Sequence, residues 1–309
     1  MASIKDWLGA FRLRTLPLSL SSIALGSFLA LEACGASFCV GEKAFSWTVF
    51  VMAIVTTLFL QILSNLANDY GDSQKGADNE GRIGPQRAVQ SGAISSQEMF
   101  KAMVICAVLA LVSGLYLVYE GTKGMELSYG LFFVLLGLGA IGAAIKYTVG
   151  KGAYGYSGFG DVFVFLFFGI AGVMGTFYLH THVWDWTVLL PAASVGFLSA
   201  GVLNLNNMRD IENDAKVGKR TLVVKMGAVK ARKYHAFLLV SAVVCALLYT
   251  YLHFQSWSQL LFFLSLPLVF MNLKAVFSIK EARNLDPLLK KLALTTTLFV
   301  LTFGLGLTM

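Results

Sequence analysis

Nine apolar stretches, each long enough to cross a bilayer, divide this chain of 309 residues. A helix of about 20 apolar residues spans the hydrocarbon core of a membrane and satisfies its own backbone polar groups there. Only 13% of the residues are charged, about half the fraction usual in soluble domains. The sequence therefore predicts an all-α polytopic membrane protein. Its nine expected spans are about 15–33, 46–67, 99–119, 127–147, 159–179, 187–207, 233–253, 257–279 and 290–308.

Basic residues are distributed unevenly between the two sides that nine spans create. Of the 24 Lys and Arg, only Lys43 and Lys123 would lie on the side opposite the N-terminus. Because membrane proteins concentrate Lys and Arg in their cytoplasmic loops, we expect a cytoplasmic N-terminus and an outer C-terminus. The net charge of +7 then reflects topology and contact with membrane lipid. No nucleic-acid partner is predicted.

Two acidic stretches lie on the predicted cytoplasmic side, one after the second span and one after the sixth. Their candidate metal ligands are Asn65, Asn68, Asp69, Asp72, Asp78, Asn206, Asp210 and Asp214. Side chains four residues apart share a helical face, and Mg²⁺ prefers such oxygen ligands. Carboxylates this close together repel one another unless a cation neutralises them.

A single Asp at the end of a helix is more simply read as a capping residue. Two matched clusters on one side of a membrane favour metal binding instead. Carboxylates at a membrane edge are costly, and they therefore usually mark a functional site. We predict that the clusters hold Mg²⁺ and that Asp69, Asp72, Asp210 and Asp214 are catalytic.

Basic residues near the clusters are candidates for binding a diphosphate. They are Arg82, Arg87, Lys151, Lys219 and Arg220. Guanidinium groups can fork onto phosphate oxygens, and ammonium groups can place a point charge beside them. The alternative is that the cations only fix topology and anchor lipid headgroups. We expect that simpler role for Lys280, Lys290 and Lys291.

The organisation of the chain suggests one domain, residues 1–309, with two related halves at about 1–125 and 126–253 followed by C-terminal helices. The long charged loops after the second and sixth spans are expected to cap the cytoplasmic mouth. Cys34 and Cys39 lie at the outer end of the first span, where a disulfide could form.

Several motifs resemble the UbiA-type intramembrane aromatic prenyltransferases. Residues 68–72 (Asn-Asp-Tyr-Gly-Asp), followed by 87–92, resemble the first signature of that family. Residues 210–214 (Asp-Ile-Glu-Asn-Asp), followed by 218–222, resemble the second. Residues 147–151 are similar to the Tyr-x-x-x-Lys element between them, which implies that Tyr147 also binds substrate. The resemblance covers nearly the whole chain and implies a UbiA-like bundle.

Within that family the motifs look most like the bacterial 1,4-dihydroxy-2-naphthoate polyprenyltransferases of menaquinone synthesis. The resemblance implies Mg²⁺-dependent transfer from a polyprenyl diphosphate to the naphthoate with loss of CO₂, at the cytoplasmic face of a bacterial inner membrane. One departure is visible, since many relatives have a third Asp at the position of Gly76. Asp78 is the nearest substitute.

Two other functions stay open at this point. A relative with another aromatic acceptor, such as 4-hydroxybenzoate, would use the same chemistry. A transporter could bind a coupling cation with paired carboxylates, usually near the middle of the membrane. The clusters here lie at helix ends beside Arg and Lys, which favours diphosphate chemistry.

Overall fold

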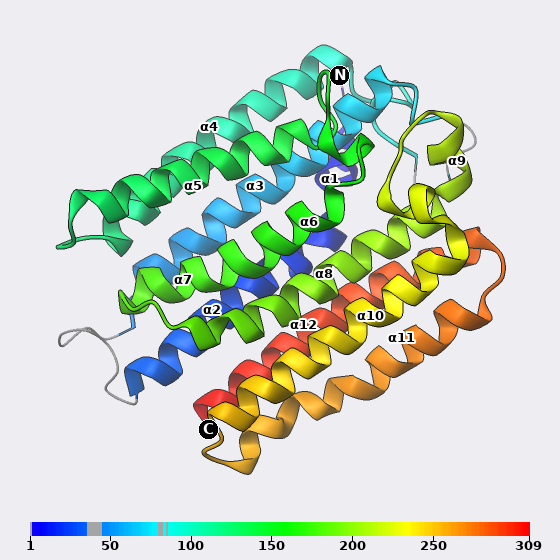
Figure 1. Ribbon diagram of the computed structural model, residues 1–309. Helices are drawn as coiled ribbons and strands as arrows, with labels where there is room; N and C mark the ends of the chain where they lie inside the picture. The colour runs from blue at the N-terminus through cyan, green and yellow to red at the C-terminus, as the bar shows by residue number, and fades with distance from the viewer. Residues whose placement is uncertain (1, 36–44, 80–82, 85) are drawn as a thin grey trace.

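The computed structural model shows a helical bundle (Figure 1). It describes residues 2–35, 45–79, 83–84 and 86–309, with the exception of the side chain of Arg14. Its α-helices are α1 Ile4–Phe11, α2 Leu16–Gly35, α3 Trp47–Gln74, α4 Ser96–Gly121, α5 Leu127–Lys146, α6 Gly160–Val164, α7 Gly172–Thr181, α8 Leu189–Arg209, α9 Ile211–Lys216, α10 Leu222–Leu252, α11 Leu266–Ser278 and α12 Asp286–Thr308. The described residues contain nine helical segments long and apolar enough to span a membrane. This confirms the predicted polytopic all-α fold.

Three spans differ in detail from the predicted ranges. Helix α3 continues to Gln74, so the first acidic cluster stays helical. Helix α10 begins at Leu222 and turns sharply at Gly227. The φ of Gly227 is 78°, a value that glycine adopts without strain. The fifth span joins α6 and α7 through a π-helical segment, Phe165–Ala171. The hydroxyl of Ser22 on α2 donates to the carbonyl of Phe168 in that segment.

The start of α4 follows directly from its sequence. Ser95 has an extended backbone and accepts from the N–H of Glu98, while the Glu98 carboxylate accepts from the N–H of Ser95. This reciprocal capping box satisfies two backbone donors that the first turn would leave free. Ser3 and Asp6 repeat the arrangement at α1.

The apolar core consists of two main clusters with a space between them. The larger cluster joins buried residues of α2, α7, α8, α10, α11 and α12, including Leu198 and Phe299. The smaller one joins α1, α3 and α4, including Leu66 and Met99, and α5 packs against it with partly buried residues. This division leaves room for a cavity where the two groups of helices face each other.

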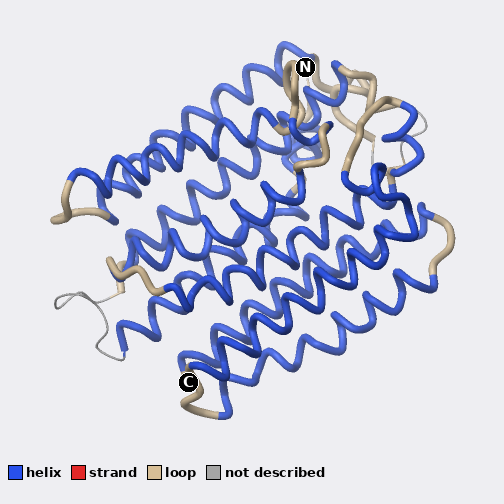
Figure 2. The backbone as a smooth tube through the Cα atoms, in the orientation of Figure 1, coloured by secondary structure: helices blue, strands red, loops and turns tan. Residues whose placement is uncertain are grey.

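The helices run roughly parallel, and the described parts are helix and loop only (Figure 2). The chain termini lie at opposite ends of the bundle, as an odd number of spans requires (Figure 1). Helix α9 and the loop after α3 gather at the N-terminal end and form the expected cap. Cys34 is disulfide-bonded, whereas Cys39 lies outside the described residues.

Candidate active site

A cavity of about 840 Å³ lies between the two main core clusters. Both predicted acidic clusters contribute to its wall at the capped end of the bundle, through Asn68, Asp72, Asp78, Asn206, Asp210 and Asp214. Away from that end the wall is apolar and continues along α2, α3, α4, α5 and the fifth span. The two clusters, which are more than a hundred residues apart in the sequence, therefore share one cavity.

Asp72 is held by one hydrogen bond and one ion pair. The Tyr156 hydroxyl donates to its Oδ1 at 2.8 Å, and the Lys219 Nζ lies 3.5 Å from its Oδ2. Burial, and next the Asp72 charge, raise the pKa of Tyr156 well above its ordinary value, so the phenol keeps the proton that it donates. Lys219 belongs to the second motif, so this ion pair connects the two clusters.

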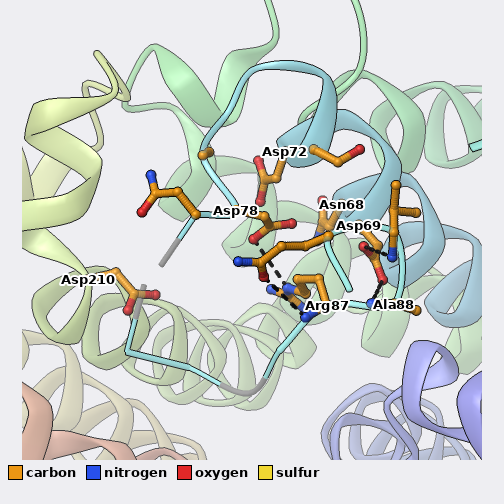
Figure 3. A network of polar contacts seen from close by, with 12 residues as sticks. Asn68, Asp69, Asp72, Asp78, Arg87, Ala88 and Asp210 are labelled. Carbon is orange, nitrogen blue, oxygen red and sulfur yellow. Dashed lines mark hydrogen bonds and ion pairs between the residues drawn. The ribbon is translucent and has the colours of Figure 1, made fainter. Parts of the chain in front are cut away.

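Asp69 faces a different direction from Asp72 (Figure 3). Its carboxylate is 1% exposed and accepts from the backbone N–H groups of Ala88 and Val89 at 3.1 and 3.3 Å. It therefore fixes the turn that follows Arg87, and it is absent from the cavity wall. The prediction that Asp69 ligates a metal finds no geometric support in this arrangement.

Asn65 lies on the same helical face as Asp69 and has a comparable structural role. Its amide donates to the carbonyl of Phe11 at 2.9 Å and to the hydroxyl of Thr15 at 3.1 Å. These bonds hold the junction between α1 and α2, where Arg12 has a left-handed φ of 51°. Asn65 is likewise absent from the cavity wall, so we leave it out of the proposed metal ligands.

Arg209 organises the second cluster. Its guanidinium binds both carboxylate oxygens of Asp210, at 2.9 and 2.6 Å, and also the side-chain oxygen of Asn206 at 2.9 Å. The Arg209 Nη1 also lies 2.5 Å from the Oδ1 of Asp286 at the start of α12. Arg209 is only 2% exposed. The cluster is thus anchored to α12 by a buried cation whose donors are matched by acceptors.

The two clusters end with the same backbone device. Gly76, four residues after Asp72, has a positive φ of 67°. Gly218, four residues after Asp214, has a positive φ of 74°. The residue after each glycine donates its N–H back to the carbonyl of the aspartate, at 2.9 and 2.8 Å. Such closures end helices and return the chain toward the helix axis. The positive φ of this turn explains why position 76 is a glycine.

Further contacts bring the capping loops onto the site. The Asn213 amide of α9 donates to the carbonyl of Ala77 at 3.0 Å. Arg87 lies 3.6 Å from the Asp78 carboxylate. In Figure 3 this pair lies between Asp210 of the second cluster and Asp69 of the first. The loop after α3 and helix α9 thus cover the same end of the cavity.

The structure divides the predicted substrate-binding residues into two groups. Arg87, Lys219 and Tyr147 line the cavity. Lys151 is exposed and lines a separate depression, and Arg220 is also exposed, so neither side chain is brought to the site. Arg82 lies outside the described residues.

Sequence reasoning missed four residues of the site. Tyr156 and Arg209 bind the two clusters directly, and only the proximity of Arg209 to Asp210 in the sequence could have suggested its role. Lys290 and Lys291 line the cavity, although we expected them to act only in topology. Their position at the start of the last span, on the same membrane side as the clusters, was the available signal.

The donor set of the cavity fits a hard divalent cation. Among the described residues, no three His, Cys, Asp or Glu side chains gather closely enough to hold a metal by themselves. This suits Mg²⁺, which takes one or two carboxylates and completes its six ligands with water and substrate phosphate oxygens. The wall supplies amide and carboxylate oxygens from both clusters.

Packing of α3 against the loop after α5 positions Asp72. A Cβ on Gly71 would lie 2.6 Å from the Thr148 Oγ1 and 2.8 Å from its backbone carbon. Because Thr148 is fixed by its bond to the carbonyl of Ala67, we expect Gly71→Ala to cost about 1–3 kcal/mol of stability. Thermal unfolding in detergent measures this. Gly139→Ala, where a Cβ meets nothing, should leave the melting temperature unchanged or raise it; equal losses would contradict the packing argument.

Comparisons with known proteins agree with the fold and identify the family. Residues 29–303 match the UbiA prenyltransferase family. A Haemophilus influenzae protein named 1,4-dihydroxy-2-naphthoate octaprenyltransferase is 43% identical over 304 residues, covering 98% of this chain and 96% of the relative. A UbiA homolog from Aeropyrum pernix K1 has a similar fold, with a TM-score of 0.66 and 13% identity, covering 92% and 97% of the two chains. A UbiA homolog from Archaeoglobus fulgidus bound to DMAPP and Mg²⁺ gives a TM-score of 0.56 and 17% identity, covering 96% and 99%.

Proposed function

The chain belongs to the UbiA prenyltransferase family, and we propose that it transfers a polyprenyl group from its diphosphate to 1,4-dihydroxy-2-naphthoate. Diphosphate and CO₂ are released, and the product is demethylmenaquinol, the reduced form of demethylmenaquinone. The enzyme would then act in menaquinone synthesis. The acceptor is proposed because the Haemophilus influenzae relative carries the naphthoate in its name and matches this chain over nearly its whole length.

The observation that carries the proposal is the two-part character of the cavity. Carboxylates from both clusters, together with Arg87 and Lys219, lie at one end, and apolar side chains line the remainder. A polyprenyl diphosphate has the same division, a multiply charged head on a long hydrocarbon tail. A coupling-cation site in a transporter would not require the apolar extension.

The cation that we propose is Mg²⁺, held by Asn68, Asp72 and Asp78 on one side and by Asn206, Asp210 and Asp214 on the other. Such an ion neutralises charge on a diphosphate as it departs. In the reaction the allylic C–O bond breaks, its electron pair leaves with the diphosphate, and a ring carbon of the acceptor forms the new C–C bond. The ring carboxylate leaves as CO₂.

The protein side chains would serve this step in three ways. Lys219 and Arg87 bind the phosphate oxygens, since both lie on the cavity wall beside carboxylates of the first cluster. Tyr156 holds Asp72 in place through its hydroxyl. The apolar wall and the capping loops exclude water, which would otherwise capture the allylic cation.

The enzyme is a multi-pass membrane protein. We propose that it resides in a bacterial inner membrane with the active site facing the cytoplasm, because nearly all Lys and Arg would lie on that side. Labelling of single cysteines introduced beside α9 and at the C-terminus would test this orientation. Modification of the C-terminal cysteine alone from the outside is the expected result.

Activity of the purified protein tests the proposed function. We expect a prenylated naphthoquinol and CO₂ from a polyprenyl diphosphate, dihydroxynaphthoate and Mg²⁺, and loss of product when a chelator is added. Readdition of Mg²⁺ should restore the activity. Product with 4-hydroxybenzoate alone would reassign the acceptor, and cation uptake into vesicles without prenyl donor would favour the transporter.

A further inference from the structure

Two of the cations on the cavity wall have no partner in the protein. Among the described residues, four Lys and Arg of the wall already bind a carboxylate or a carbonyl: Arg12, Arg87, Arg209 and Lys219. The side chains of Lys290 and Lys291 form no ion pair or hydrogen bond within the described part of the chain. Both belong to the last span, Ala282–Thr308. An ammonium group within a span and without a counter-ion usually marks a functional site.

Contacts on both sides of Lys290 along α12 fix the direction in which this residue faces. Asp286 pairs with Arg209 of α8 at 2.5 Å. Farther along α12, Leu292 packs on α8, since a Cβ on Gly201 would lie 3.3 Å from its Cδ2. Lys290 follows Asp286 by four residues, so the two side chains share one face of α12. Lys290 therefore lies about 6 Å beyond Asp286 along the helix axis, and it lines the cavity.

This position is the border between the charged and the apolar parts of the cavity. Helix α12 begins at the end of the bundle where α9 lies and runs to the opposite end (Figure 1). The next wall residues along α12 are Ala293 and Leu294, which are apolar. No charged residue follows Lys291 in the sequence. Lys290 thus places a positive charge one turn inward from the second cluster.

The aromatic acceptor of the proposed reaction has to occupy the same border. Its ring attacks the prenyl carbon that is bonded to the diphosphate, so the ring lies beside the phosphates on their apolar side. The phosphates themselves have Arg87 and Lys219 at the charged end. Dihydroxynaphthoate carries one further anionic group, its carboxylate, and Lys290 is a cation without a partner at the matching depth.

We propose that Lys290 binds the carboxylate of the aromatic acceptor. This inference rests on the proposed function and adds the residue that selects a carboxylated ring. The ion pair exists only before the bond between ring and carboxylate breaks. The bonding electron pair then stays with the ring, and CO₂ leaves without charge. Lys290 therefore stabilises bound substrate rather than the transition state, and it does not hold back the uncharged product.

Steady-state kinetics of Lys290→Gln test the proposal. We expect the KM for dihydroxynaphthoate to rise about tenfold to a hundredfold, the range for losing one interaction with a charged group. The kcat and the KM for the polyprenyl diphosphate should stay close to their wild-type values, because the lost contact contributes to acceptor binding alone. Lys290→Arg keeps the cation and should retain most of the affinity. A purely structural role for Lys290 would not produce this split between KM and kcat.

Two competing ring compounds isolate the contribution of the carboxylate. We expect the wild-type protein to be inhibited by 1-hydroxy-2-naphthoate at about tenfold or more lower concentration than by 1-naphthol, which lacks the carboxylate. In Lys290→Gln the two inhibition constants should become similar. An undiminished preference for the carboxylated inhibitor in this variant would contradict the proposal.

Lys280→Gln is the matched control. Lys280 is exposed and does not line the cavity, so both KM values should be unchanged. Unfolding temperatures establish that each variant is folded. An unchanged KM for dihydroxynaphthoate in Lys290→Gln, or an increased KM for the polyprenyl diphosphate in its place, would overturn the proposal. Absence of prenylated product from the wild-type protein would instead refute the proposed function.

Discussion

Asp72→Asn should lower turnover by about 10²–10³-fold, the usual cost of removing one preorganised charge from an active site. The amide keeps the shape of the side chain and can still accept from Tyr156, but it loses the charge that pairs with Lys219 at 3.5 Å. Steady-state assays over a range of Mg²⁺ concentrations measure the effect. A higher Mg²⁺ requirement is expected, because a neutral amide oxygen binds the ion more weakly than a carboxylate.

Asp69→Asn separates this effect from the general loss of a buried carboxylate. Asp69 accepts from the two backbone N–H groups of Ala88 and Val89, and an amide can satisfy only one of them well. We expect lower thermal stability, a smaller loss of kcat and an unchanged Mg²⁺ requirement. If both variants needed more Mg²⁺, Asp69 would have to join the metal ligands after all. Near-normal activity in Ala variants of Asp72, Asp210 and Asp214 would refute the two-cluster mechanism.

Arg209→Met should destabilise the protein by about 3–5 kcal/mol, the range for removing one partner of a buried ion pair. The substitution keeps an unbranched, flexible side chain but leaves Asp210, which is 6% exposed, without the guanidinium that binds both its oxygens. Asp286 and Asn206 lose their partner at the same time. Thermal or denaturant unfolding in detergent measures the loss.

Arg283→Ala provides the surface comparison. Arg283 pairs with Glu281 at 3.0 Å, and the two side chains are 68% and 60% exposed. Such pairs contribute about 0–1 kcal/mol, so its melting temperature should stay close to that of the wild-type protein. A stable, fully active Arg209→Met variant would mean that the buried network does not hold α8 to α12.

The spans could be predicted from the sequence because their signal is local. Hydropathy alone locates nine segments, and the Ser95 capping box marks the start of α4 within the sequence itself. The length of α3 was underestimated since its last turns carry Asn and Asp, which lower the hydropathy while the helix continues. Polar residues at a helix end do not by themselves end the helix.

The face of α3 that meets the cavity could not be predicted in the same way. Asn65 and Asp69 share one helical face, and Asn68 and Asp72 share another about 60° away. Both faces carry buried polar groups, so composition does not show which one meets the substrate. The choice depends on tertiary contacts, since the loop at Ala88 takes one face and the cavity takes the other. Lys151 was misplaced for the same reason.

The charge gradient along the cavity also bears on how the reaction ends. Diphosphate is soluble in water, whereas a prenylated naphthoquinol is soluble in hydrocarbon. A chamber with acids and bases at one end and apolar walls beyond them lets each product depart into the phase that dissolves it. Neither has to pass the other or cross an unfavourable medium. Partitioning between two solvents would then make the reverse reaction slow, without any moving gate.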